Sequence, residues 1–136
     1  MGAQAKLRGF ANHTYGSGRQ PGFFLFDDET CVRISWAFKE NMINSYTIIE
    51  PVQKDGGVLI PAGAVFNDGE TIGIVYEDVW IPSVNSDNEE IGSVPGSLVT
   101  RGTIDLSKAP ALREAVDTLG AQGFKFMYSG VVERPY

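Results

Sequence analysis

The 136-residue chain has very few of the residue types from which metal sites, disulfides and catalytic dyads are built. It contains one cysteine, Cys31, and one histidine, His13. A single cysteine excludes an intramolecular disulfide, and one Cys with one His argues against a zinc site held by this chain alone. Cys31 is expected as a half-buried strand residue. His13 lies in a polar, glycine-rich stretch that would not hold a general base rigidly, so we predict neither Ser-His-Asp nor Cys-His catalysis.

Long apolar runs and nucleotide-binding motifs are also missing. No stretch approaches the ~20 apolar residues of a membrane span, and the N-terminus lacks the apolar core of a secretory signal. No phosphate-binding or dinucleotide-binding glycine motif occurs. We therefore expect a soluble protein made in a cytoplasm, with no cofactor, no metal and no membrane partner.

Negative charge is absent from the first 26 residues, which carry Lys6, Arg8 and Arg19 for a net +3. Residues 27–136 carry eight bases and seventeen acids, a net −9, so the whole chain has the net charge of −6. Phosphate binding needs clustered Lys and Arg. Nucleic acid is therefore not expected as a partner.

Glycine is abundant, with sixteen in the chain, above the usual share of ~7%. Short apolar runs separated by turn residues predict about eight short strands and one late helix, arranged as a compact antiparallel β-barrel or sandwich. Residues 1–22 are expected as an extended N-terminal arm, and residues 23–136 as a single β-rich domain. The predicted strands fall at about 23–26, 31–38, 46–50, 58–60, 64–66, 71–75, 79–81, 97–104 and 124–128.

Local patterns predict how several of these segments fold. Alternation in 31–38 predicts a strand whose core face carries Val32, Ile34, Trp36 and Phe38. Pro61-Ala62-Gly63 and Asn67-Asp68-Gly69 predict turns, and Gly73 predicts a bulge or a close backbone approach. Apolar residues at helical spacing predict a helix over Leu112–Leu119, with Pro110 in its first turn and Gly120 as its C′ residue.

Acidic turns provide the only enzymatic hypothesis. Asp27, Asp28 and Glu29 form one group, and Asp87, Glu89 and Glu90 form another, which gives paired carboxylates for glycoside hydrolysis or ligands for calcium. Solvated turns are the simpler interpretation. Trp80, between two apolar residues and before Pro82, is expected at the edge of the core or in a subunit interface.

In the middle of the chain, Leu59-Ile60-Pro61-Ala62-Gly63 is followed by Asn67-Asp68-Gly69, and then by Ile72-Gly73-Ile74-Val75 and the glycine-containing strand 98–104. This order of motifs resembles the head decoration and head-fibre proteins of tailed bacteriophages. A short helix and a closing strand complete the pattern, so the resemblance covers roughly residues 57–128.

This resemblance implies a non-enzymatic structural protein of the virion. Its implied partner is the major capsid protein, to whose outer surface it would bind as a homotrimer and which it would stabilise. We expect the arm to cross a neighbouring capsid subunit, so that deletion of residues 1–22 abolishes binding. Two alternatives remain: a tail or baseplate structural protein, and a carbohydrate-binding or carbohydrate-cleaving domain using Asp87, Glu89 and Trp80. The expected partner-binding residues of the arm are Lys6, Leu7, Arg8, Phe10, Tyr15 and Arg19.

Overall fold

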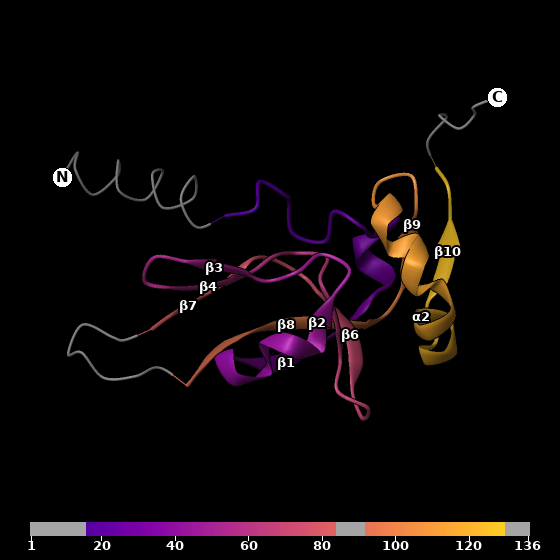
Figure 1. The fold of residues 1–136 in the computed structure, drawn as a ribbon. Helices are drawn as coiled ribbons and strands as arrows, with labels where there is room; N and C mark the ends of the chain where they lie inside the picture. The colour runs from indigo at the N-terminus through magenta and orange to yellow at the C-terminus, as the bar shows by residue number, and fades with distance from the viewer. Residues whose placement is uncertain (1–15, 84–91, 130–136) are drawn as a thin grey trace.

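The computed structural model describes residues 16–83 and 92–129 (Figure 1). Its ten strands and four short helical segments follow one another along the chain as η1 (Asp28–Thr30), β1 (Val32–Lys39), η2 (Glu40–Ser45), β2 (Tyr46–Thr47), β3 (Val52–Lys54), β4 (Gly57–Ile60), β5 (Val65–Asn67), β6 (Ile72–Val75), β7 (Val79–Pro82), β8 (Ser93–Arg101), β9 (Thr103–Asp105), η3 (Pro110–Ala115), α2 (Val116–Gln122) and β10 (Lys125–Met127). The expected mainly β fold is confirmed.

A five-stranded antiparallel sheet in the order β1-β8-β6-β5-β2 is the central layer. Successive side chains of a strand point to opposite faces of the sheet. In β8, Leu98 packs into one apolar cluster and its neighbour Val99 into another, and β6 divides Val75 and Ile74 in the same way. The central strands are therefore buried on both faces, and the domain has two cores that share one sheet.

The first core lies between the central sheet and a three-stranded sheet in the order β3-β4-β7. Strand β4 is buried along its whole length, and its Gly57 allows β7 to approach: a Cβ at this position would lie 2.3 Å from the carbonyl oxygen of Ile81. Aromatic rings from the central sheet fill the space between the layers, and the ring centroids of Tyr46 and Phe66 are 4.9 Å apart. This pair of sheets forms a sandwich-like half of the domain.

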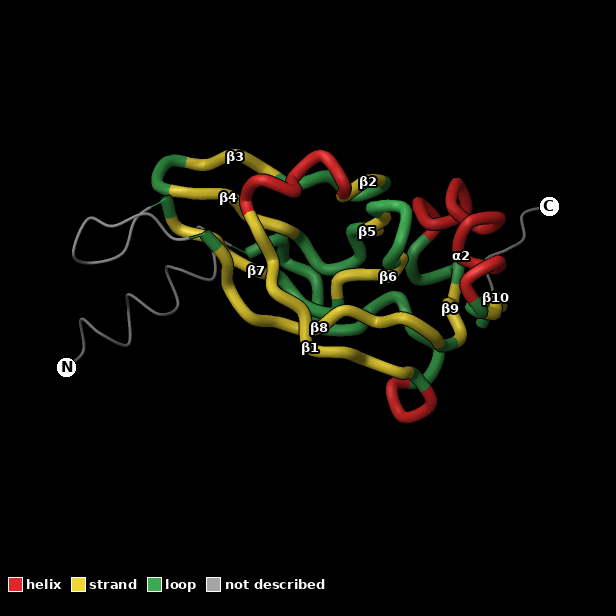
Figure 2. Tube along the Cα trace, turned by 90° about the horizontal axis from the view of Figure 1, so that it is seen from below, coloured by secondary structure: helices red, strands yellow, loops and turns green. Residues whose placement is uncertain are grey.

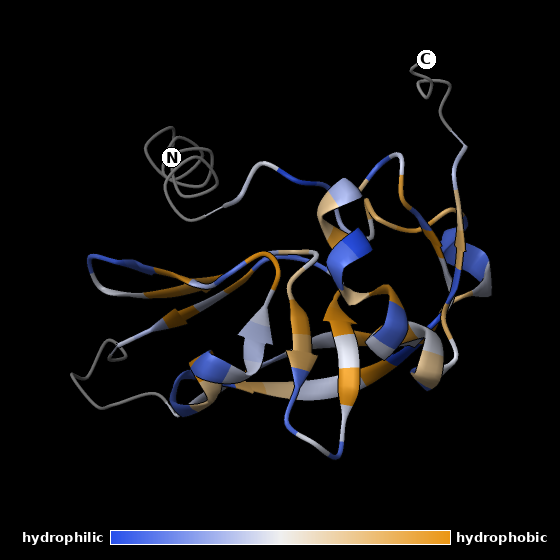
Figure 3. Cartoon of the chain, turned by 45° about the vertical axis from the view of Figure 1, so that its right-hand side comes forward, coloured by the Kyte–Doolittle hydropathy of each residue, from blue (hydrophilic) through white to orange (hydrophobic). Residues whose placement is uncertain are grey.

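The second core covers the opposite face with η3, α2 and the parallel pair β9 and β10. Leu112 and Leu119 from the helical segments are fully buried there, together with Phe24 from the chain before β1. In Figure 3 the hydrophobic colours follow the central strands, while hydrophilic colours dominate the turns. Helices and sheet thus give this half of the domain an α+β arrangement.

Two turns and one close approach are confirmed. The Asn67-Asp68-Gly69 turn leads from β5 to β6, with Gly69 at φ 94°. The Pro61-Ala62-Gly63 turn connects β4 to β5, with Gly63 at φ 93°. At Gly73 a Cβ would lie 2.7 Å from the Val99 carbonyl oxygen of β8, so the glycine permits close contact between β6 and β8 rather than a bulge. The irregularity in this sheet lies instead between Val32 and Arg33 of β1.

Two predictions about the strands of the sheets are wrong. Residues 23–26 form a turn with a single bridge from Leu25 to Ile104, because Phe24 and Leu25 are needed in the helical core rather than in a sheet. The predicted core face of β1 is buried only at Phe38, while Val32 and Ile34 are exposed, because β1 is an edge strand.

The helix also differs from its prediction. It begins as the 3-10 segment η3 at Pro110 and continues as α2 to Gln122. Gly120 lies inside α2, and the residue that ends the helix is Gly123, at φ 123°. Its N–H donates to the carbonyl oxygens of Leu119 and Gly120, so the conformational freedom of glycine is required three residues later than the sequence pattern indicated.

Candidate functional site

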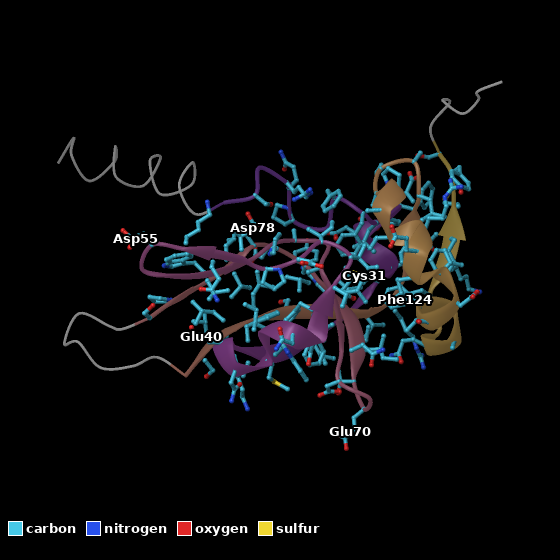
Figure 4. The ribbon with its side chains drawn as sticks, in the orientation of Figure 1. Cys31, Glu40, Asp55, Glu70, Asp78 and Phe124 are labelled. Atoms are coloured by element: carbon cyan, nitrogen blue, oxygen red, sulfur yellow. The ribbon has the colours of Figure 1, made fainter. Side chains whose placement is uncertain are left out.

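Residues 16–22, here called the entering segment, lead into the domain. They contact the carboxylate of Asp78, which lies between β6 and β7. The N–H of Ser17 donates to Asp78 Oδ2 over 2.6 Å, and the Ser17 hydroxyl donates to Oδ1 over 2.7 Å. The N–H of Ala62 also donates to Oδ1, over 2.8 Å. Asp78 therefore ties the entering segment to the Pro61-Ala62-Gly63 turn, and Figure 4 shows it beside that segment.

A second contact holds the other end of the entering segment. The Gly22 N–H donates to the carbonyl oxygen of Tyr76 over 2.7 Å, so residues 16–22 lie against the connection 76–78. Arg19 is exposed, with its guanidinium carbon 5.8 Å from the centroid of the Phe23 ring. A hollow of about 410 Å³ lies at this junction, between the entering segment and Glu77 and Asp78.

Among the expected partner-binding residues of the arm, only Arg19 lies within the described part of the chain. Lys6, Leu7, Arg8, Phe10 and Tyr15 lie outside the described residues, so their role as partner-binding residues stays a prediction. What the structure adds is the place where the arm joins the domain, namely the contacts of Ser17 and Gly22 with residues 76–78.

Strand β1 is an outer strand of the central sheet and pairs with β8 alone among the described strands. All of its first four residues are exposed, and Val32 and Ile34 keep 47% and 37% of their surface accessible. Shallow hollows of about 350 Å³ and 180 Å³ adjoin Trp36 and Ala37. This edge combines a row of backbone groups that pair with no strand among the described residues with exposed apolar side chains.

The first acidic turn has a structural role at the start of β1. Asp27 caps η1 by accepting from the Glu29 N–H over 2.9 Å. Asp28 accepts from the Tyr76 hydroxyl over 2.9 Å, and the guanidinium of Arg33 stacks on the same ring, 4.2 Å from its centroid. Asp27 thus holds the turn itself, and Asp28 connects the turn to the end of β6.

Cys31 follows the acidic turn and is half-buried, just before β1 rather than inside it. Burial and then the negative charge of Asp28 raise the pKa of its thiol. The thiol also contacts the carbonyl oxygen of Asp28, 3.2 Å away. Because the thiolate is the reactive form of cysteine, this environment disfavours nucleophilic chemistry.

Trp80 lies on β7, opposite Leu59 of β4, and is half-buried. Its ring lies over Gly57, where a Cβ would be 2.8 Å from the indole Cζ2. The expectation that it sits at the core edge or in a subunit interface fits this position, and the interface role stays a prediction. Asp87, Glu89 and Glu90 lie outside the described residues, so the second acidic turn and its carbohydrate chemistry stay predictions as well.

Two buried polar atoms near the β1 edge have no hydrogen-bond partner in the described part of the chain: Trp36 Nε1 and the Tyr46 hydroxyl. Burial raises the pKa of Tyr46 to about 12, and the nearby Trp36 indole acts in the opposite direction. The indole is thus close enough to influence the phenol without the geometry of a hydrogen bond. The Phe66 ring packs against both side chains, its centroid 5.0 Å from that of Trp36.

The most completely satisfied buried charge is Asp105, at the end of β9, with no accessible surface. Ser107 donates to Oδ1 from its N–H over 3.1 Å and from its hydroxyl over 2.5 Å. Ser129, after β10, donates from its N–H over 3.1 Å and from its hydroxyl. Burial alone would raise the pKa of Asp105, yet these hydrogen bonds lower it to about 2. The ionised carboxylate fastens the end of β10 beside β9.

Among residues 16–83 and 92–129, no group of three or more His, Cys, Asp or Glu side chains is placed to hold a metal ion. No helix within those residues has the length and apolar character needed to cross a membrane. Comparison with known protein families, curated proteins and solved structures finds no match to this chain. Function is therefore argued from the residues and surfaces described above.

The sequence did not reveal the two surfaces that stand out in the structure. Ser17 and Asp78 are 61 residues apart, and neither belongs to a local motif that announces their contact. Alternation in residues 31–38 correctly predicts a strand, but alternation does not distinguish an edge strand from a central one. The available signal was the basic character of β1, since Arg33 and Lys39 are its only charged residues.

Proposed function

We propose that this protein is a structural component of a bacteriophage virion that binds the outer surface of the capsid and stabilises the shell. The observation that carries the proposal is the segment 57–128, whose motifs resemble those of head decoration and head-fibre proteins. In the fold this segment supplies β4 to β10 and most of both cores. The part of the chain that carries the resemblance is therefore the scaffold of the domain.

The junction at Asp78 supports a role for the arm in binding. Hydrogen bonds hold residues 16–22 against the connection 76–78, so the segment before Gly16 starts from a fixed point on the domain. That segment carries Lys6 and Arg8 and no acid, whereas the rest of the chain is acidic. A basic arm fixed at its base suits an acidic patch on a capsid subunit.

Removal of residues 1–15 tests the proposal. Truncation before Gly16 keeps Ser17 and its contacts with Asp78, which a deletion to residue 22 would destroy. We expect the truncated protein to keep the thermal midpoint of the full chain to within ~2 °C and to lose capsid binding at least tenfold. Binding is measured by co-sedimentation with empty shells assembled from a tailed-phage major capsid protein.

Two controls make the result specific. A full-length variant with Lys6→Gln and Arg8→Gln separates charge from length. We expect it to bind more weakly than the intact chain at low ionic strength and to depend less on ionic strength, because the charges that salt screens have been removed. A scrambled arm of the same composition tests whether order matters. The proposal fails if the intact chain does not sediment with shells, and the role of the arm fails if the truncated chain binds as well as the intact one.

A further inference from the structure

The edge of the central sheet formed by β1 has the features of a docking site for an extended segment. An edge strand exposes a row of unpaired N–H and C=O groups to which another strand can add. β1 has eight residues, whereas the opposite edge of the same sheet, β2, has two. From Arg33 to Lys39 its pairing with β8 is continuous and contains no proline on the β1 side. Figure 2 shows β1 running beside β8, from η1 to η2.

Side chains at this edge are exposed although they are apolar. Val32 and Ile34 keep 47% and 37% of their surface accessible. Ile34 pairs with Leu98, which is fully buried, so Ile34 lies on the core face of the sheet but beyond the end of what covers it. An added strand would bring a neighbour for Ile34, as cross-strand pairs do within a sheet.

The charge of the edge identifies the chemistry of its partner. β1 and β8 together carry Arg33, Lys39 and Arg101 and no acid, in a chain of net charge −6. All three are exposed, and no ion pair links them to a carboxylate within the described residues. Glu40 follows β1, and Asp28 before it accepts from the hydroxyl of Tyr76, on whose ring Arg33 stacks. Part of the charge of Arg33 is thus balanced within the domain, and Lys39 and Arg101 carry the rest of the positive charge at this edge.

A second copy of the same strand fits this edge poorly in the register that pairs the two β1 strands over their longest charged span. In an antiparallel pair of two β1 strands centred on Trp36, Arg33 of one copy lies opposite Lys39 of the other. Like charges opposite each other destabilise a strand pair. An acidic strand would place a carboxylate near each base instead.

We propose that β1 binds an extended acidic segment of another protein, which adds as a sixth strand to the central sheet. Backbone hydrogen bonds supply the affinity, and alternating apolar and acidic side chains of the partner match Ile34 on one face and Arg33 on the other. This goes beyond capsid binding by the arm, because it assigns a second surface and the kind of segment that the surface takes.

A synthetic peptide tests the proposal directly. The probe is an end-capped eight-residue peptide alternating valine and glutamate, and its counterpart has lysine in place of glutamate. With the full-length protein we expect the glutamate peptide to slow amide hydrogen exchange in β1 at least tenfold at saturation. The lysine peptide is expected to leave β1 exchange unchanged, and methylation of alternate peptide nitrogens is expected to abolish protection. Lack of protection by the glutamate peptide would overturn the proposal.

Matched variants locate the binding. Ile34→Lys is expected to raise the dissociation constant of the glutamate peptide at least tenfold. Val52→Lys, on the edge strand β3 and similarly exposed at 43%, is expected to change this constant less than twofold. Lys39→Glu should weaken binding through charge alone, and Lys125→Glu, exposed on β10, should not. Equal losses for Ile34→Lys and Val52→Lys would refute the assignment to β1.

Self-association is the remaining outcome. Sedimentation equilibrium of the full chain gives its mass with and without Ile34→Lys. If the wild-type protein is an oligomer that Ile34→Lys converts to monomer, the occupant of the edge is a second copy and the proposal is wrong. An unchanged mass together with weakened peptide binding supports it. Thermal unfolding of each variant confirms that the folded domain is being compared.

Discussion

At the scale of single residues, Asp105 shows how a buried charge can stabilise a fold. Its carboxylate has no accessible surface and accepts four hydrogen bonds from Ser107 and Ser129. Burial disfavours the ionised carboxylate, but the hydrogen bonds outweigh this cost. As a result, the pKa of Asp105 is lowered to about 2. A buried charge with all its partners present contributes to stability, whereas one left without partners is costly.

Replacement of Asp105 by Asn should destabilise the domain by about 2 kcal/mol at neutral pH, which is the free energy equivalent to this pKa shift. Since the folded-state pKa lies below the unfolded one, the contribution is fully present above pH ~4 and is lost as pH falls to ~2. Urea unfolding at several pH values measures this, with the exposed Glu114→Gln as control. If the gap between wild type and Asp105→Asn stays constant from pH 7 to pH 2, the carboxylate is not the stabilising species.

No residue pattern around Asp105 predicts its hydrogen bonds with Ser107 and Ser129. Its sequence neighbours suggested the end of a strand, and Ser129 lies 24 residues away. The same is true of the contact between Ser17 and Asp78. Hydrogen bonds between distant side chains depend on tertiary placement, which periodicity and turn preferences do not encode. Asn67-Asp68-Gly69 is the opposite case, because the bonds of Asp68 to Glu70 and Thr71 are local.

At the scale of elements, two glycines near the end of α2 have different roles that the sequence does not distinguish. Gly123 has φ 123°, a conformation that side-chain-bearing residues rarely adopt, whereas Gly120 lies within the helix. A Cβ added at Gly120 would lie 3.7 Å from the Phe126 ring, an ordinary contact. One position therefore needs glycine for its backbone and the other does not.

We expect Gly123→Ala to destabilise the domain by about 1–3 kcal/mol, the cost of a strained backbone conformation. Gly120→Ala should stabilise it by up to about 1 kcal/mol, since alanine favours a helix interior over glycine. Chemical denaturation of both variants measures the difference. Equal effects, or a stable Gly123→Ala, would mean that the helix ends elsewhere.

Most elements were predictable because they have local signals. Strand alternation, the Pro61-Ala62-Gly63 turn and the helical spacing each placed an element near its observed position. Elements failed where tertiary context decides. Residues 23–26 have the composition of a strand but supply Phe24 to the helical core. Ile48 adopts φ 72° in a tight turn closed by the Ile49 N–H to Thr47, a strained conformation for a β-branched residue that no sequence rule predicts.

At the scale of the whole molecule, the question is whether two cores make one folding unit. Adjacent residues of β5, β6 and β8 point into different cores, as Leu98 and Val99 do. Loss of order in either core therefore disturbs strands that also form the other. We therefore expect the layers around the shared sheet to unfold as one cooperative domain, and the single domain over 23–136 stays a prediction.

Matched truncations of buried leucines test this cooperation. Leu98 lies in the core between the two sheets and Leu119 in the helical core, and both are fully buried. Each change to Ala should cost about 2–5 kcal/mol. Fluorescence of Trp36 and Trp80 reports on the sheet half, and circular dichroism at 222 nm reports mainly on α2 in the other half.

For both Leu98→Ala and Leu119→Ala we expect the two signals to shift together to the same lower urea midpoint with an unchanged slope, as a two-state transition requires. Val52→Ala, at an exposed position on β3, should leave the free energy of unfolding from either signal within about 0.5 kcal/mol of the wild-type value. If Leu98→Ala moves only the fluorescence transition and Leu119→Ala only the helical one, the halves unfold independently. The shared strands would then connect two folding units rather than join them into one.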